Sequence, residues 1–302
     1  MTTRTMPRGR RLSLARPGVA GPVFVAPFLA LFLLLFITPL GYAAYLSLFQ
    51  HRLIGGTTFV GLKNYVTALS DPLLREGVAH VALFFVIQVP VMIVLALLFA
   101  LALDSGLMRL SRVIRLGIFL PYAVPSVVAT LMWGYLYGPS FGPFAQIGRH
   151  FHVSVPNFLG HTWMLGSLGN IVTWEFTGYN MIILYAALQT IPRDLYEAAA
   201  VDGAGPWRIA RAIKLPALRP ALTLVLLFSV IGSFQLFNEP ALLQPLAPNV
   251  IDNSYTANLY ADSLAFTGQQ VNYAAAVSFL LGLLIVIISY VFLYLANRRR
   301  PR

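Results

Sequence analysis

The chain has 302 residues, of which 58% are hydrophobic and only 10% are charged, and its mean hydropathy is +0.74. Soluble domains carry about 25% charged residues, so this composition indicates an integral membrane protein. The absence of cysteine excludes disulfides, thiolate metal sites and cysteine nucleophiles. The formal net charge of +11 raises nucleic-acid binding as an alternative, which the placement of the charges has to decide.

The apolar residues gather in six segments that are each long enough to cross a bilayer. A helix needs about 20 apolar residues to cross the hydrocarbon core, which is roughly 30 Å thick. Because backbone polar groups in lipid must be bonded within the protein, and the alternation of barrel strands is absent, we expect helices. The predicted spans are residues 22–48, 79–103, 114–137, 163–188, 218–237 and 272–296. The sequence therefore predicts an all-α integral membrane protein with six transmembrane helices.

Proline and glycine interrupt three of the predicted spans. Pro90 lies in the second span, Pro121 and Pro125 lie in the third, and Gly232 lies in the fifth. Kinked spans are common in transporters, but proline and glycine are frequent in membrane helices in general. The first span has about 27 apolar residues, far more than the 7–15 of a signal-peptide core, so we expect it to be retained.

The basic residues gather on one side of the predicted spans. They lie in the N-terminal tail (residues 1–21), in and beside the loop after the second span, in and beside the loop at residues 191–216, and in the C-terminal tail (residues 297–302). The residues concerned are Arg4, Arg8, Arg10, Arg11, Arg16, Arg109, Arg112, Arg115, Arg193, Arg208, Arg211, Lys214, Arg219, Arg298, Arg299, Arg300 and Arg302. The positive-inside rule places these segments in the cytoplasm. The net charge is thus a topology signal, nucleic acid is excluded as a partner, and residues 22–296 form one transmembrane domain with both tails cytoplasmic.

The loop at residues 191–216 contains the stretch YEAAAVDGAGPWRIARAIKLP and has the pattern of two short helices. Asp194 followed by Glu197 has the spacing of a capping box, and the alanines after Glu197 are good helix formers. Gly203 then ends the first helix and turns the chain. Pro206 suits the first turn of a second helix, which the closing Leu-Pro pair ends before the fifth span.

The same loop resembles the signature of the permease subunits of binding-protein-dependent ABC importers. That signature reads EAA, three residues, G, nine residues and I-x-LP. Its fixed positions are matched by Glu197, Ala198, Ala199, Gly203, Ile213, Leu215 and Pro216. The stretches FLPYAVPSVVATLMW, TGYNMIILYAALQTIPRDLYEAAAVDGAG, SFQLFNEPALL and YTANLYADSLAF also resemble the carbohydrate permeases of this superfamily. In place of the T-x-GGP motif of many sugar permeases the chain has LLQPLAPNVIDNS, which favours the lactose-type and glycerol-phosphate-type branch over the maltose-type branch.

The resemblance implies a type I ABC importer permease fold, with a five-helix core and a peripheral first helix, in the bacterial cytoplasmic membrane. It implies that the chain is not an enzyme and holds no cofactor, because separate ATPase subunits bind ATP and magnesium. The implied partners are these ATPase subunits, a second, homologous permease, an extracytoplasmic sugar-binding protein and the lipid bilayer. The resemblance also implies a coupling loop that binds the ATPase through Asp194, Tyr196, Glu197, Ala198, Ala199, Asp202, Gly203, Ile213, Leu215 and Pro216.

Polar and aromatic residues in and beside the spans are candidates for substrate contact. Glu175 is the one acidic residue inside a predicted span, where burying a charge is costly, so it is a functional candidate by default. Aromatic rings can stack on the CH faces of a sugar, and amide or carboxylate groups can bond its hydroxyls. The pathway candidates are Trp133, Glu175, Tyr179, Asn180, Gln235, Asn238 and Glu239. For Trp133 an aromatic belt at the membrane interface is the alternative role.

The predicted function is the import of a sugar, neutral or amino, mono- or oligosaccharide, by ATP-driven alternating access. An importer of glycerol phosphates or of another polar organic solute is the alternative within the superfamily, although no basic residue lies in the middle of a span to meet a phosphate. A secondary transporter that uses Glu175 as a proton or cation site is a further alternative. No metal-ligand spacing, paired intramembrane carboxylates or nucleophile motif is found, so we expect neither a metal site nor catalysis.

Overall fold

The computed structural model describes residues 20–52, 55–106 and 110–298. Several of the basic residues that predict the topology lie outside these ranges, namely those of the N-terminal tail, Arg109, Arg299, Arg300 and Arg302. Arg298 is described and is the last residue of α15.

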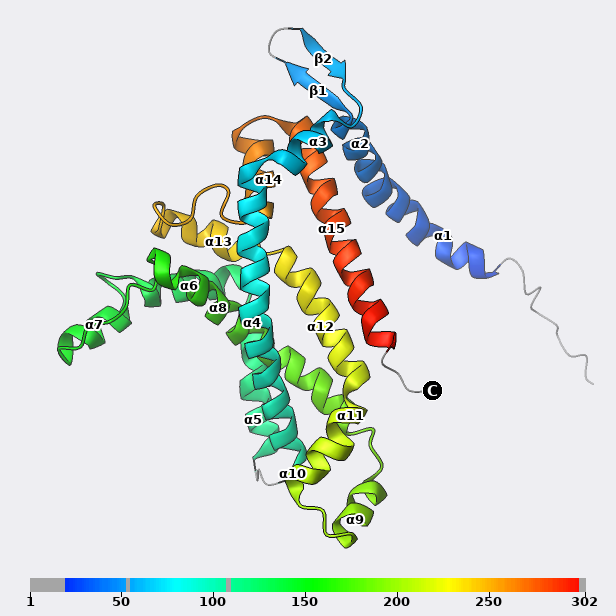
Figure 1. Ribbon diagram of the computed structural model, residues 1–302, viewed down its shortest axis with the longest axis vertical. Coiled ribbons are helices and arrows are strands. Elements are labelled where there is room, and N and C mark those ends of the chain that lie inside the picture. Colours follow the sequence, from blue (N-terminus) through cyan, green and yellow to red (C-terminus); the bar gives the residue numbers. More distant parts are fainter. Residues whose placement is uncertain (1–19, 53–54, 107–109, 299–302) are drawn as a thin grey trace, which may run out of the picture.

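Four long helices form the centre of the protein (Figure 1): α4 (Pro72–Asp104), α8 (His161–Leu188), α12 (Arg219–Phe234) and α15 (Val271–Arg298). The helix α4 packs against α8 and α12, and α12 packs against α15. Ala96 and Ala100 of α4 are completely buried against Met181 and Leu184 of α8. Small residues at such an interface let two membrane helices approach closely, so the pattern of the sequence explains the close packing of α4 on α8.

Among the described residues, three segments are long and apolar enough to cross a membrane as single helices: Phe24–Ser47, Pro72–Asp104 and Val271–Ala296. Two bent pairs qualify as further spans, Ser111–Ala123 with Ser126–Tyr137 and Pro206–Ala217 with Arg219–Phe234. These five correspond to all the predicted spans except the fourth. That one is α8, which has the length of a span but is less apolar because polar residues such as Glu175 interrupt it. The number six therefore stays a prediction.

The first predicted span lies apart from the bundle. It comprises α1 (Ala20–Phe32), a π-helical turn η1 (Leu33–Ile37) and α2 (Thr38–Ser47). α2 packs against α15, whereas α1 diverges from the other helices (Figure 1). Its apolar side chains are exposed in the isolated chain, Phe24 being 84% exposed. This arrangement confirms the prediction of a peripheral first helix.

The third predicted span is broken. α5 (Ser111–Phe119) leads into a 3₁₀ turn, η2 (Leu120–Ala123), and α6 (Ser126–Tyr137) then leaves at an angle of 95° to the first part. The break lies at Pro121 and Pro125, for which the sequence left a kink and an ordinary membrane-helix proline as alternatives, because proline lacks the backbone N–H that would continue the helix. By contrast, α4 runs without a break through Pro90 and α12 runs through Gly232, so these two residues do not divide their helices.

Short elements cover the end of the bundle at which α4 and α15 begin (Figure 1). They are the antiparallel strands β1 (Phe49–Arg52) and β2 (Gly56–Phe59), and the helices α3 (Lys63–Ser70), α14 (Ala257–Asp262) and η5 (Ser263–Thr267). The helices α7 (Pro143–His150) and α13 (Asn238–Leu243) instead pack against α6 at one side of the bundle, and η4 (Gln244–Leu246) follows α13 there (Figure 1). The hairpin departs from the all-α prediction, because two strands of four residues carry too little pattern to be recognised in a loop.

Asp71, directly before α4, joins several of these elements. Its Oδ2 accepts hydrogen bonds from the hydroxyls of Tyr260 and Tyr273 at 2.6 and 2.7 Å, and its Oδ1 accepts one from the backbone N–H of Leu73. Burial acts to raise the pKa of Asp71, but these hydrogen bonds, with a further one from the backbone of Leu74, outweigh it and hold the pKa below its ordinary value. The ionised carboxylate therefore fastens α14 and α15 to the start of α4.

Candidate functional site

A cavity of about 380 Å³ lies among α4, α8, α12 and the segment that leads into α13. Five of the predicted pathway residues line it, namely Tyr179, Asn180, Gln235, Asn238 and Glu239. They come from α8 and from the chain after α12, which the fold brings together although they are far apart in sequence. The other lining groups are mostly apolar and aromatic, with Gln88, Ser229 and Ser233 as additional polar groups. A mainly apolar wall with a few convergent polar groups is typical of a small-molecule site.

Tyr122 of η2 is a wall residue that the sequence analysis missed. Its ring stacks on Tyr179, with the ring centroids 4.8 Å apart and the planes at 22°, and it meets the edge of Phe176 at 5.8 Å. Pro121 and Pro125 could have pointed to this wall, because they break the helix, and irregular backbone inside a membrane is tolerated only where it is buried in protein or lines a cavity. The broken third span therefore presents an aromatic ring to the cavity.

The wall contributed by α4 was also missed. Gln88 donates hydrogen bonds to Oγ1 of Thr173, at 3.2 Å, and to the sulfur of Met92, at 3.4 Å. Asn180 of α8 donates to the same sulfur at 3.4 Å. A single amide in the apolar sequence of α4 was the available signal, since polar side chains of membrane helices face the interior of the protein.

Glu175 does not line the cavity. It is 5% exposed, and its Oε2 has no hydrogen-bond partner among the residues that the structure describes. Glu239, which is 8% exposed at the start of α13, lies close enough for the two charges to interact. The turn after α12 brings α13, which carries Glu239, into contact with α8, although the two carboxyl groups are far apart in sequence.

Trp133 is also separate from the central cavity. Its ring lies 5.4 Å from that of Tyr137 and 5.9 Å from that of Trp174, and it lines a second cavity of about 400 Å³ beside α6 and α7. The first turn of α8 provides Trp163 to the same cavity. The 95° bend explains the separation, because it directs α6 away from the axis of α5 and hence from the central cavity.

At the opposite end of the bundle, the coupling loop comprises α9 (Arg193–Val201), α10 (Pro206–Ile209), a π-helical turn η3 (Ala210–Lys214) and α11 (Leu215–Ala217) (Figure 1). The predicted capping box is wrong. α9 begins at Arg193, directly after Pro192, and no side chain caps it, so Asp194 lies within its first turn. In the first turn its negative charge still stabilises the helix, because it interacts favourably with the positive end of the helix dipole.

The predicted turn after the first helix is confirmed. Gly203 has a φ of +76°, and its N–H donates to the carbonyl of Ala200 at 3.0 Å, while the N–H of Ala204 donates to that of Ala199 at 2.9 Å. This pair of bonds is a Schellman motif, whose left-handed position favours glycine. Pro206 opens α10 as predicted. The second helix extends beyond the predicted Leu-Pro end to Ala217, where the chain bends by 64° into α12.

The surface of the coupling loop is part polar and part apolar. Of the residues predicted to bind the ATPase, those that are exposed are Asp194, Glu197, Ala198, Asp202 and Gly203, and those that are half-buried are Tyr196, Ala199, Ile213, Leu215 and Pro216. Three large apolar side chains were missed: Leu195, Val201 and Trp207 are 50%, 88% and 77% exposed. Exposed apolar groups gathered on one loop are typical of a surface that binds another protein.

A bundle of long apolar helices, with a polar and aromatic cavity inside it and a loop that exposes large apolar side chains at one end, is typical of a membrane transport protein. Residues 92–301 match the family described as the binding-protein-dependent transport system inner membrane component. The chain belongs to this family, whose members are transport permeases. The predicted membership is thereby confirmed.

Relatives of known role match over most of their length. The chain is 31% identical over 289 residues to the lactose transport system permease protein LacF of Rhizobium radiobacter, covering 93% of this chain and 95% of that one. It is 31% identical over 279 residues to the arabinooligosaccharides transport system permease protein AraP of Bacillus subtilis, covering 91% and 88%. It is 29% identical over 284 residues to the trehalose transport system permease protein SugA of Mycobacterium tuberculosis, covering 92% and 89%.

The fold is shared with solved transporters. The crystal structure of a bacterial ABC transporter involved in the import of the acidic polysaccharide alginate superposes with a TM-score of 0.81 at 18% identity, covering 92% of this chain and 95% of that one. A second structure, in which the alginate transporter is in complex with an alginate pentasaccharide-bound periplasmic protein, gives a TM-score of 0.78 at 18% identity, covering 91% and 92%. The type I permease fold predicted from the sequence is confirmed.

Proposed function

We propose that this chain is a permease subunit of an ATP-driven importer that carries a neutral sugar or oligosaccharide into the cytoplasm. The observation that carries the proposal is the wall of the central cavity. The stacked rings of Tyr122 and Tyr179 offer a face for the CH groups of a sugar, and the amides of Asn180, Gln235 and Asn238 offer donors and acceptors for its hydroxyls. The sugars named for the related permeases support the same class of substrate.

A phosphate ester fits this cavity less well. Among the described residues that line it there is no lysine or arginine, and the nearby charged groups are the carboxylates of Glu175 and Glu239. Burying a phosphate against carboxylates would add repulsion to the cost of desolvation. A neutral or amino sugar is therefore favoured over a glycerol phosphate.

The two ends of the bundle have different partners in this proposal. The coupling loop and the C-terminal end of α15 face the cytoplasm, as the positive-inside rule requires, and the loop inserts into an ATPase subunit that binds ATP and magnesium. The end that carries the β1–β2 hairpin and α14 receives the sugar from an extracytoplasmic binding protein. A second, homologous permease completes the pathway, with the cavity at or near their interface. Closure of the ATPase subunits moves the coupling loop and switches the side from which the cavity is open.

Uptake by cells with and without the gene tests the proposal. Radiolabelled lactose, arabinooligosaccharides, trehalose and glycerol 3-phosphate are offered to a strain that lacks the chain and to the same strain with the chain restored. We expect restored uptake of at least one neutral sugar, abolished by depletion of ATP and insensitive to a protonophore when ATP is maintained. Uptake of glycerol 3-phosphate alone would indicate the alternative substrate, and collapse with the proton gradient at constant ATP would indicate a secondary transporter.

A matched pair of variants tests the cavity itself. Gln235→Leu keeps the size of the side chain and removes an amide from the cavity, whereas Gln244→Leu removes an amide that bonds Asn253 outside it. We expect the first variant to raise the KM of uptake about tenfold, since an unpaired sugar hydroxyl costs roughly 1–3 kcal/mol, and the second to leave KM unchanged. An equal KM in the two variants would place the substrate elsewhere.

A further inference from the structure

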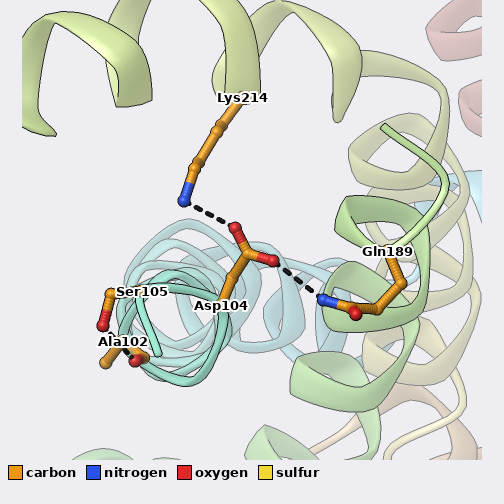
Figure 2. Close-up of polar contacts among 5 residues, drawn as sticks. All are labelled: Ala102, Asp104, Ser105, Gln189 and Lys214. Atoms are coloured by element: carbon orange, nitrogen blue, oxygen red, sulfur yellow. Dashed lines mark hydrogen bonds and ion pairs between the residues drawn. The ribbon is translucent and has the colours of Figure 1, made fainter. Parts of the chain in front are cut away.

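A buried carboxylate joins the coupling loop to the two helices that form the cavity. Oδ2 of Asp104 lies 2.5 Å from Nζ of Lys214, and Oδ1 accepts a hydrogen bond from Nε2 of Gln189 at 2.8 Å (Figure 2). Lys214 is the partner of Oδ2, which accepts no hydrogen bond from another described group. The two charged side chains are 7% and 13% exposed. We call Asp104, Gln189 and Lys214 the carboxylate junction.

Each member of the junction ends a structural element. Asp104 is the last residue of α4, Gln189 directly follows α8, and Lys214 is the last residue of η3 in the coupling loop. The coupling helix α9 joins them through Tyr196, because Nζ of Lys214 lies over its ring at 5.1 Å from the centroid. Burial raises the pKa of Tyr196, and the charge of Asp104 raises it further.

The same helices carry the cavity wall farther up. α4 carries Gln88 and Met92, and α8 carries Tyr179 and Asn180. A helix is stiff along its axis, so a displacement of its inner end reaches residues several turns away. The coupling loop thus has a direct polar connection to both walls of the cavity, in addition to its covalent connection to α12.

Stability alone is a weak reason for such a pair. Removing two charges from water costs about as much as their attraction returns, so a buried ion pair often contributes little to folding and instead fixes one geometry. Of the described residues, only these two form a salt bridge between side chains, and they do so at the point where the coupling loop meets α4.

We propose that Asp104 and Lys214 are positioning residues that transmit the movement of the coupling loop to α4 and α8, so that ATP binding by the partner subunit changes access to the cavity. This inference rests on the proposed function as an ATP-driven importer. It assigns to the pair a role in coupling ATP binding by the partner subunit to the accessibility of the cavity. Holding the ATPase subunit in place is a separate role, which in this proposal belongs to the exposed face of α9.

The test uses the whole transporter, purified with its co-expressed subunits and placed in lipid nanodiscs. Because the chain has no cysteine, Ser229→Cys introduces a single thiol into the cavity wall of this chain. A membrane-impermeant fluorescent maleimide then reports, on the gel band of this chain, how accessible the cavity is. The rate of labelling is compared without nucleotide and with ATP plus vanadate, which traps the ATPase in its closed state.

The decisive variant removes both charges at once, as Asp104→Asn with Lys214→Met. It leaves no unpaired buried charge, so we expect the chain to fold and to retain its ATPase subunit. We expect the nucleotide-dependent change in labelling rate to shrink about tenfold, within the usual range of coupling between sites. The exchanged pair, Asp104→Lys with Lys214→Asp, should restore part of the change. Arg211→Met, which removes an exposed charge from the same turn, is the matched control and should behave as the parent.

The outcomes separate the two proposals. If the parent transporter shows no nucleotide-dependent change in labelling, the proposed ATP-driven function fails. If the parent shows the change and the neutral double variant shows it equally, the pair is structural and this inference is overturned. Loss of the ATPase subunit from the double variant would also overturn it, because the pair would then be holding the docking surface rather than transmitting movement.

Discussion

The substitution Gly203→Ala isolates the backbone requirement of the turn after α9. Gly203 has a φ of +76°, and no atom lies within 4 Å of a Cβ added there, so alanine introduces strain without a clash. The left-handed conformation costs an L-residue about 1–2 kcal/mol. Gly205, two residues further on, has a φ of −70° and an equally open Cβ position. Gly205→Ala therefore adds neither strain nor a clash and is a matched control.

Hydrogen exchange measures this cost directly. The strain acts on the turn whose N–H groups bond the carbonyls of Ala199 and Ala200, and 1–2 kcal/mol corresponds to about a 5–30-fold rise in the population of the open turn. We expect the amides of Gly203→Ala at residues 203–204 to exchange faster by that factor, and those of Gly205→Ala to match the parent. Gly203→Asn should fall between them, because asparagine tolerates this conformation better than alanine.

Transport gives the functional side of the same prediction. If the turn positions α9 for the ATPase, the coupled uptake of sugar should fall in the order of the exchange rates, with Gly205→Ala unaffected. Equal exchange in the two alanine variants would refute the assignment of strain to Gly203. Normal exchange with lost uptake in both variants would show instead that the partner contacts this open surface and that bulk, rather than φ, is what it rejects.

Three further predictions concern the two ends and the centre of the bundle. Hydrogen bonds hold the pKa of Asp71 below its ordinary value, so the ionised group stabilises the fold above about pH 4. This contribution is lost as the pH falls through the folded-state pKa. We therefore expect Asp71→Asn to have a lower Tm than the parent at about pH 7, and the two Tm values to approach each other near about pH 3. A Cβ on Gly178 would lie 2.7 Å from Cα of Phe119, so Gly178→Ala should destabilise the protein by roughly 1–3 kcal/mol in denaturant unfolding, whereas Gly166→Ala on the same helix, with open space around its Cβ, should not. Tyr122→Ala removes a stacked ring from the cavity and should raise the KM of sugar uptake about fivefold. Tyr122→Phe keeps the ring and should change the KM little. An unchanged KM in both variants would show that the ring does not contact the substrate.

The sequence predicted those features whose physical cause is local. The length of the apolar segments defines the helices, the prolines at 121 and 125 define the break in the third span, and Gly203 defines a turn that few other residues adopt without strain. The spacing of the EAA signature identified the family because a motif with fixed positions is rarely matched by chance. Each of these features depends on residues within one continuous stretch of the chain, which is what a single sequence displays.

The features that escaped prediction are those that depend on contacts between distant segments. α13 with Glu239 packs against α8 because the chain turns back after α12, and Trp133 is separate from the central cavity because the bend directs α6 away. The capping box failed for a different reason. Pro192 fixes its own backbone and takes the N-cap position that the motif assigns to Asp194, so the helix starts two residues earlier than the capping box requires.

Lys214 shows how a residue can be seen in the sequence and still be misread. Its charge was counted only as part of the topology signal, yet its half-buried ammonium group forms an ion pair with Asp104. The reason lies in α4, which extends past the apolar segment to place a carboxylate at the level of the coupling loop. Along the same helix, Pro90 lies between the cavity residues Gln88 and Met92 and leaves one backbone carbonyl without its helical partner. α4 is therefore held at its end by the coupling loop and lacks one helical hydrogen bond beside the cavity, while the helix itself continues without a break between the two points.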